Sequence, residues 1–193
     1  MNKSIFSCAI AAAVVFAASA QAEDLTGFFV NGDAGHVDYR ANINNHFAGT
    51  AGGTAEIINI GYRTQFIGFE AGYTDLGSIS GNDQVGDSYK LSGKGFTIGM
   101  NGHFNPTEHW YISTRVGGFR WRLDARVTSG GSSVSGYDQG LGWYAGAGTG
   151  YDFNRHWSVG VAYNYYSINK NYAGLGKMDI GSNVFTVDAE YRF

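Results

Sequence analysis

The sequence is short of cysteine, proline and long apolar runs. It contains one cysteine, Cys8, and one proline among 193 residues. A lone cysteine excludes a framework of intramolecular disulfides and a zinc site made of several cysteines. Beyond residue 18, no apolar run approaches the roughly 20 residues that a membrane-spanning helix needs. Helical membrane proteins are therefore excluded.

Charge is also scarce. Charged residues make up 15% of the chain, the formal net charge is −3, and no run of Lys and Arg occurs. This balance predicts no nucleic-acid partner. Four histidines, His36, His46, His103 and His109, show no metal-ligand spacing, and no phosphate-binding glycine motif opens a helix. We expect neither a metal nor a cofactor.

Glycine and aromatic residues, by contrast, are abundant. Glycine accounts for 30 of the 193 residues, and aromatic residues make up 16%. This glycine content is roughly twice the usual ~7%. Glycine at this level can indicate disorder, but disordered chains lack aromatic residues. The composition therefore favours a folded chain that needs many small side chains.

The first 22 residues have the pattern of a secretory signal peptide. Lys3 supplies a positive start, the run from Ile5 to Ala18 is almost entirely apolar, and Ala20-Gln21-Ala22 is a small-x-small cleavage site. Cleavage after Ala22 leaves a single domain, 23–193; cleavage after Ala20 is the alternative. Cys8 lies inside this segment, so we expect a processed chain without thiols.

The rest of the chain alternates large apolar residues with polar ones. Successive strand side chains face opposite sides of a sheet, so the last eleven residues form a strand with one apolar and one charged face. Its apolar side chains are those of Phe185, Val187, Ala189, Tyr191 and Phe193. Repeated strands of this kind need an apolar exterior and a polar interior. A transmembrane β-barrel provides both.

Eight segments show this alternation, and an even number is typical of bacterial barrels. We expect an all-β, eight-stranded antiparallel, up-and-down barrel with strands near 26–37, 54–64, 66–76, 94–104, 110–124, 141–153, 157–167 and 182–193. Short turns are expected near 64–66, 105–109 and 154–156. Long polar loops are expected at 38–53, 77–93, 125–140 and 168–181. This asymmetry is typical of short periplasmic turns and longer outer loops.

Aromatic residues beside the short turns predict a girdle at the periplasmic membrane surface. Its members are Phe104, Trp110, Phe153, Trp157, Tyr191 and Phe193.

In the predicted strand at 110–124, the apolar residues switch from one face of the strand to the other. Ile112 and Val116 belong to one face, but Phe119, Trp121 and Leu123 belong to the other. A β-bulge at Gly117-Gly118 restores a continuous apolar face toward lipid. The bulge also turns three arginines inward, which spares lipid a charge that costs ~2–4 kcal/mol at the bilayer midplane. They are Arg115, Arg120 and Arg122.

The inward charges predict an ion-pair network that fills the lumen, because unpaired charges in a narrow interior are costly. Its expected members are Asp33, Glu70, Arg115, Arg120, Arg122, Asp188, Glu190 and Arg192, with Asp152 nearby.

Four segments resemble the transmembrane domain of the outer membrane protein A family. They are GYRTQFIGFEAGYTDLG (61–77), YKLSGKGFTIGMNGHF (89–104), YISTRVGGFRWRLD (111–124) and the terminal EYRF. The resemblance implies an eight-stranded barrel with four outer loops, serving as a small pore, an anchor, an adhesin or a phage receptor. It implies that the terminal aromatics, Tyr191 and Phe193, are read by the barrel-assembly machinery. Many members also carry a periplasmic peptidoglycan-binding domain, which we do not expect after the eighth strand.

The resemblance extends only in part to the gate that controls conduction in family members. Glu70 matches an acidic gate residue, but Asn101, Gly150 and Gly160 stand where the family has lysine, the second acid and arginine. The gate as such is absent, and Arg115 is the expected partner of Glu70. The two inward glycines predict a wider water-filled path.

We therefore expect a structural barrel of the outer membrane of a Gram-negative bacterium, with low-conductance passive diffusion of small solutes through a charged lumen. The alternative is an adhesin whose outer loops bind a host or phage surface. A lipid A-modifying enzyme is less favoured, because its only candidate pair, His156 and Ser158, lies at a short turn; we expect no enzyme. Expected partners are outer-membrane lipids, lipopolysaccharide, the barrel-assembly machinery and periplasmic chaperones, and the expected state is a monomer.

Overall fold

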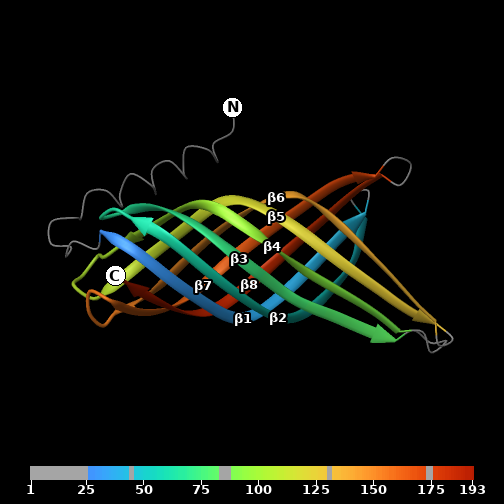
Figure 1. Ribbon diagram of the computed structural model, residues 1–193, viewed down its shortest axis with the longest axis horizontal. Coiled ribbons are helices and arrows are strands. Elements are labelled where there is room, and N and C mark those ends of the chain that lie inside the picture. The colour runs from blue at the N-terminus through green and yellow to red at the C-terminus, as the bar shows by residue number, and fades with distance from the viewer. Residues whose placement is uncertain (1–25, 44–45, 83–87, 130–131, 173–175) are drawn as a thin grey trace.

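The computed structural model describes residues 26–43, 46–82, 88–129, 132–172 and 176–193. The predicted signal peptide lies outside them. Within these ranges the chain forms eight strands, each hydrogen-bonded to the next, with the last closing on the first (Figure 1). They are β1 (Gly27–Ile43), β2 (His46–Arg63), β3 (Ile67–Asn82), β4 (Ser88–Phe104), β5 (Trp110–Ser129), β6 (Ser132–Asp152), β7 (Trp157–Tyr172) and β8 (Gly176–Arg192). All pairings are antiparallel, which confirms the predicted barrel.

The strands cross the barrel obliquely. Following paired residues once around the barrel from Gly27 leads back to β1 at Val37, which lies 37 − 27 = 10 residues farther along the strand. A shift of this size tilts eight strands by about 40° and leaves an interior about wide enough for side chains. Among the described residues, no helix has the length and apolar character needed to span a membrane.

The predicted long loops are wrong, because most of their residues continue the strands. The described parts of 38–53, 77–93, 125–140 and 168–181 belong to the barrel wall, and β5 pairs with β6 as far as Ser129 and Ser132. Backbone ladders need no particular side chains, so Gly, Ser and Asn can extend a paired strand. These residues do not alternate between apolar and polar, and the sequence signal fades there.

The two ends of the barrel differ. The turn end carries the segments 64–66, 105–109 and 154–156 and the C-terminal Phe193, at the left of Figure 1. The extended end is opposite, where the strands run past their predicted limits. In the half next to the turn end, outward side chains are large, apolar and exposed, and we call them the apolar belt. Its members include Phe28, Val30, Ile58, Ile60, Tyr62, Phe69, Phe96, Ile98, Met100, Ile112, Val116, Val159, Val161, Phe185 and Val187.

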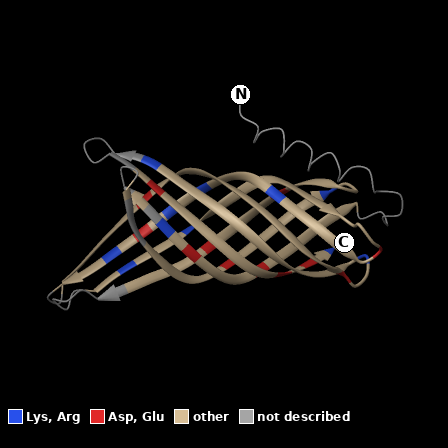
Figure 2. Cartoon of the chain, turned by 180° about the vertical axis from the view of Figure 1, so that it is seen from behind, with Lys and Arg blue, Asp and Glu red and all other residues tan. Residues whose placement is uncertain are grey.

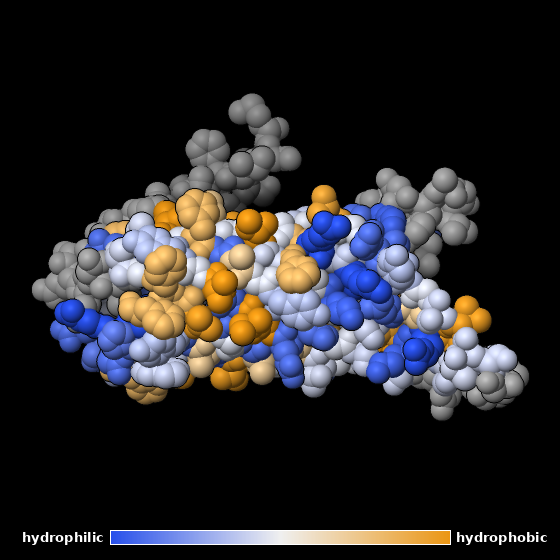
Figure 3. All heavy atoms as spheres, in the orientation of Figure 1, coloured by the Kyte–Doolittle hydropathy of each residue, from blue (hydrophilic) through white to orange (hydrophobic). Residues whose placement is uncertain are grey.

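Toward the extended end the pattern is reversed. On the face shown in Figure 3, hydrophilic side chains cover much of the outer surface there, next to the apolar belt. Most of the inward side chains at that level are apolar and buried, and we call these apolar residues the apolar plug. It consists of Val37, Ala55, Ile57, Leu76, Phe119, Trp121, Leu123, Tyr144, Tyr166, Ile168 and Val184.

The expected bulge at Gly117-Gly118 is wrong. The β4–β5 and β5–β6 pairings run without a shift through these glycines. Phe119 and Trp121 are only 1% exposed and point into the barrel, whereas Arg120 is exposed on the outer face. The phase change marks the level at which the wall leaves the apolar belt, so large apolar residues there pack inward instead of facing lipid.

A bulge does occur in β3. The β3–β4 register shifts between Asp75 and Ser78. Gly77 has φ 75° there, a backbone conformation that favours glycine, and its amide donates to the carboxylate of Asp75 at 2.7 Å.

Candidate functional site

The half of the lumen nearest the turn end contains a buried arginine, Arg63, that was not predicted from the sequence. Arg63 donates two hydrogen bonds to the carboxylate of Glu190, each 2.9 Å long, and its Nε donates to Asn101 Oδ1 at 2.7 Å. Its guanidinium also lies 4.5 Å from the ring centre of Phe29. Continuing the inward phase of 54–64 from Asn59 would have placed Arg63 in the lumen. A bidentate pair of this kind fixes orientation as well as charge.

Asp152 joins the last strand to the turns. Its Oδ1 accepts hydrogen bonds of 2.5 Å from Arg192 and from the hydroxyl of Ser158. Its Oδ2 lies 2.6 Å from Asn105 Nδ2 and 3.1 Å from His103 Nε2. Arg192 Nε also lies 3.2 Å from the carboxylate of Glu190. The terminal strand is thereby tied to the floor of the lumen.

Arg115 lies at the middle of the barrel between two acids. Its Nη1 is 3.0 Å from Asp33 Oδ2, and its Nε is 4.0 Å from Glu70 Oε1. The stronger contact to Glu70 comes from Tyr144, whose hydroxyl donates at 2.8 Å. The structure therefore brings Arg115 near Glu70 and gives Glu70 a second partner that the sequence did not suggest.

Asp188 lies directly across from Asp33 in the β1–β8 pairing, and Tyr111 donates a hydrogen bond to it at 3.2 Å. Among the described residues, this part of the lumen holds five carboxylates, three arginines and one histidine. They are Asp33, Glu70, Asp152, Asp188, Glu190, Arg63, Arg115, Arg192 and His103.

Two expected members of the network lie elsewhere. Arg120 and Arg122 point away from the lumen, and the side chain of Arg122 is 48% exposed. The large ion-pair network fills the half of the lumen near the turn end, and the apolar plug fills the other half. A separate ion pair, Lys170 with Asp138, lies beside the plug residue Trp121. Figure 2 shows charged residues along the barrel wall.

The inward glycines make room for aromatic rings. A Cβ at Gly150 would lie 2.5 Å from the hydroxyl oxygen of Tyr111, which also blocks a side chain at Gly160. A Cβ at Gly99 would lie 2.5 Å from the hydroxyl oxygen of Tyr144, and one at Gly117 would meet the same ring at 2.7 Å. The expected wider water path at Gly150 and Gly160 is therefore wrong, because Tyr111 occupies that space.

The apolar plug is built mainly from stacked rings. Tyr144 and Tyr166 stack with their centres 5.7 Å apart, and Phe119 meets Tyr166 edge-on at 5.0 Å. Trp121 is 1% exposed and lies against the position of Gly140, where a Cβ would be 2.5 Å from its ring. These rings come from β5, β6 and β7 and fill the lumen above Arg115.

The predicted aromatic girdle lies on the outer surface at the turn end. Trp157 packs on Tyr191 with ring centres 4.9 Å apart, and Tyr191 packs on Phe193 at 5.0 Å. Phe104, Trp110 and Phe153 lie at the other strand ends there. The terminal aromatics thus face the surroundings of the barrel.

The two residues of the candidate enzyme site are not brought together. Ser158 is fully buried and donates to Asp152, whereas the His156 ring lies 2.7 Å from the backbone oxygen of Arg192. Among the described residues, no group of three or more His, Cys, Asp or Glu is arranged to hold a metal.

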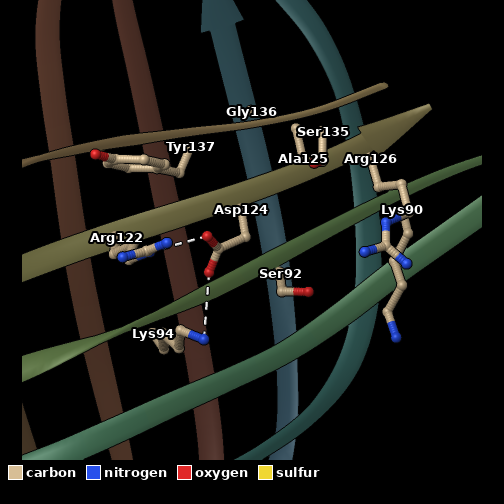
Figure 4. A pocket seen from close by; sticks show the side chains of 10 residues that line it. All are labelled: Lys90, Ser92, Lys94, Arg122, Asp124, Ala125, Arg126, Ser135, Gly136 and Tyr137. Atoms are coloured by element: carbon tan, nitrogen blue, oxygen red, sulfur yellow. Dashed lines mark hydrogen bonds and ion pairs between the residues drawn. The ribbon is translucent and has the colours of Figure 1, made fainter. Parts of the chain in front are cut away.

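A cluster of cations covers the outer surface of β4 and β5 at the extended end. We call it the basic face; it consists of Lys90, Lys94, Arg120, Arg122 and Arg126. Asp124 lies within it, 2.8 Å from Arg122 and 3.2 Å from Lys94 (Figure 4). The hydrogen bond from Arg122 lowers the pKa of Asp124 from its ordinary value. The sequence hid this cluster because its members occupy alternate positions on two strands.

An apolar belt around a closed barrel with a polar, ion-paired interior defines a transmembrane β-barrel of the outer-membrane class. Comparison with known families agrees. The outer membrane protein beta-barrel domain family matches residues 8–193, and the chain belongs to this family. It is an OmpA-like protein of the outer membrane of a Gram-negative bacterium.

Two curated relatives are similar over part of their length. Outer membrane protein A of Serratia marcescens is 27% identical over 137 residues, and that of Yersinia pseudotuberculosis is 25% identical over 136. Each match covers 69% of this chain but only 38% of the relative.

Two solved structures share the fold at low identity. Neisserial surface protein A superposes with a TM-score of 0.60 at 21% identity, over 86% of this chain and 97% of that one. Ail, the attachment invasion locus protein of Yersinia pestis, was solved in complex with the heparin analogue sucrose octasulfate. It gives a TM-score of 0.55 at 16% identity, over 86% and 99% of the two chains.

Proposed function

We propose that this chain is a closed structural barrel that displays its extended end at the cell surface for interaction, and that it is not a diffusion channel. The observation that carries this proposal is the apolar plug. Phe119, Trp121, Tyr144 and Tyr166 are each 1% exposed and stack across the lumen. Water and ions crossing the barrel would have to pass packed rings that offer few polar partners.

Three further considerations support display at the surface. Short turns face the periplasm in such barrels, so we expect the extended end to lie outside the cell. β5 and β6 stay paired as far as Ser129 and Ser132, so the extended end is formed by hydrogen-bonded strands there. Ail, which has the same fold, binds a sulfated ligand in its crystal structure. In this proposal the binding surface is formed by the strand extensions, whereas the alternative hypothesis from the sequence assigned it to outer loops.

Passive diffusion of small solutes is the second candidate, and the polar half of the lumen favours it. The relatives and neighbours described above are outer-membrane and surface proteins rather than enzymes, which supports a role without catalysis.

We also propose Tyr191 and Phe193 as the signal for the barrel-assembly machinery, because both side chains lie at the outer surface of the last strand.

Single-channel recording in planar bilayers tests the proposal. The refolded chain should give no discrete openings, and the double variant Phe119→Ala/Trp121→Ala should give small ones because it removes two plug rings. Folding of both samples is verified by heat-modifiable migration in gels. Discrete openings of the unaltered, folded chain would overturn the proposal in favour of diffusion.

Surface display is tested separately on intact cells. An epitope tag inserted after Ser129 should bind antibody without permeabilisation, whereas one inserted in the 105–109 turn should not. The reverse labelling would contradict the proposed orientation.

A further inference from the structure

The basic face begins where the apolar belt ends. On β4 the outward side chains run from Phe96, which is 66% exposed, to Lys94 and then to Lys90. Phe96 pairs with Arg120 on β5, so the first outward cation of β5 lies beside the last outward apolar residue of the belt on β4. Arg126 lies six residues beyond Arg120 on β5. In a barrel whose strands tilt by ~40°, this separation corresponds to about 15 Å along the barrel axis. The cations therefore occupy a layer just outside the hydrocarbon.

Lipid headgroups occupy that same layer. The outer leaflet of this membrane consists of lipopolysaccharide, whose lipid A carries phosphates at the edge of its hydrocarbon. Arginine binds phosphate oxygens in pairs, and lysine binds them as a point charge. Each Lys or Arg near an anionic lipid surface strengthens association about fivefold.

The distribution of charge around the extended end is uneven. Outward side chains on β1, β2 and β3 at this level carry three acids, Asp38, Glu56 and Asp75, and one arginine, Arg40. His36 is also outward on β1 and lies 3.2 Å from Asp38. On β4 and β5 the five cations of the basic face surround a single acid, Asp124, among the described side chains. Charges that served only solubility would be mixed on all sides.

Part of the basic face is held in place before any ligand arrives. Asp124 links Arg122 to Lys94, as the dashed lines in Figure 4 show. The guanidinium of Arg122 lies 4.3 Å from the ring centre of Tyr137 on β6. Lys90 and Arg126 pair across β4 and β5 and lie side by side. A site whose side chains are ordered in advance loses less entropy on binding.

We propose that the basic face of β4 and β5 binds the phosphate groups of lipid A in the outer leaflet. The proposal rests on the fold and on the position of the cations relative to the apolar belt. It does not depend on whether the lumen conducts or on what the extended end meets outside the cell.

The test measures binding of purified lipid A to the chain refolded in detergent micelles. Phosphorylated lipid A should bind, lipid A stripped of its phosphates should bind at least tenfold more weakly, and inorganic phosphate alone should not compete at equal concentration. The double variant Lys94→Gln/Arg120→Gln should weaken binding of phosphorylated lipid A roughly 30-fold, since it removes two cations. A second pair, Lys90→Gln/Arg126→Gln, probes the upper part of the same face.

The matched control for the single variant Arg120→Gln is Arg155→Gln. It removes one arginine charge from the 154–156 turn at the opposite end of the barrel, and it should leave binding within about twofold of the unaltered chain, whereas Arg120→Gln should weaken it about fivefold. All variants are compared as folded, heat-modifiable barrels. Equal weakening in the control, or equal binding of dephosphorylated lipid A, would overturn the proposal.

Sucrose octasulfate supplies the competing outcome. If the basic face served a soluble polyanion outside the cell, this probe would bind the unaltered chain, lose affinity in the double variants, and leave lipid A binding unchanged in them. That pattern would also overturn the lipid proposal.

Discussion

The two halves of this barrel follow opposite rules. Next to the turn end, apolar side chains face outward and charged ones face inward, as a wall in lipid requires. At the extended end, apolar rings face inward and most charged side chains face outward, as in a protein dissolved in water. β5 contains both rules: Val116 is 56% exposed, whereas Trp121 is 1% exposed. The surrounding medium, rather than the strand itself, decides which alternate face is apolar.

The comparison predicts the largest loss where a buried charge loses its partner. Arg63→Ala should lower the free energy of unfolding by about 3–5 kcal/mol, because Glu190 keeps its charge but loses two hydrogen bonds in a buried site. Urea titration of the barrel in lipid vesicles measures this. The control Arg63→Met/Glu190→Leu removes both charges and should cost much less. If the double variant lost as much as the single one, charge burial would not be the cause.

A smaller loss is expected in the plug. Trp121→Ala should cost about 3 kcal/mol, because it leaves a cavity among rings that pack closely. Trp143 offers a matched control, since it is 47% exposed on the outer face of β6. Trp143→Ala should cost clearly less in the same urea titration. Equal losses would mean that the plug contributes no more to stability than the outer surface does.

The smallest effect concerns the contact between the two halves. Tyr144 belongs to the plug by its ring and to the charged network by its hydroxyl, which donates to Glu70. Tyr144→Phe should lower the free energy of unfolding by about 1 kcal/mol, the usual contribution of one hydrogen bond. Tyr163→Phe, which removes an exposed hydrogen bond to Asn183, should change it less. Indistinguishable values would remove the evidence for coupling between the halves.

The sequence predicted the half of the fold that lies in the membrane. Alternation located all eight strands and placed Glu70, Asp33 and Arg115 in the lumen, because lipid imposes the same rule on every strand there. It failed beyond that level, where the rule reverses. The phase change after Val116 was attributed to a local bulge because one strand read alone cannot show that its neighbours change as well.

The candidate sites were less predictable for related reasons. Arg63 followed the inward phase but lay at the end of a predicted strand, where no pattern drew attention to it. Tyr111 and Tyr144 fill the lumen only because glycines on neighbouring strands make room for them, and those pairings depend on the register. The basic face joins residues of two strands, β4 and β5, whose members are separated along the chain by more than twenty residues. None of these features is a local property of the sequence.

The glycines beneath Tyr144 also bear on how the barrel is assembled. A slip of β6 by two residues against β5 would keep every side chain on its correct face, so lipid and water alone could not reject it. The slip would move Tyr144 from Gly117 to Phe119 or Arg115, where its ring would collide with another large side chain. Steric clashes of the aromatic rings thus disfavour shifted registers between neighbouring strands that the alternation of polar and apolar residues would permit.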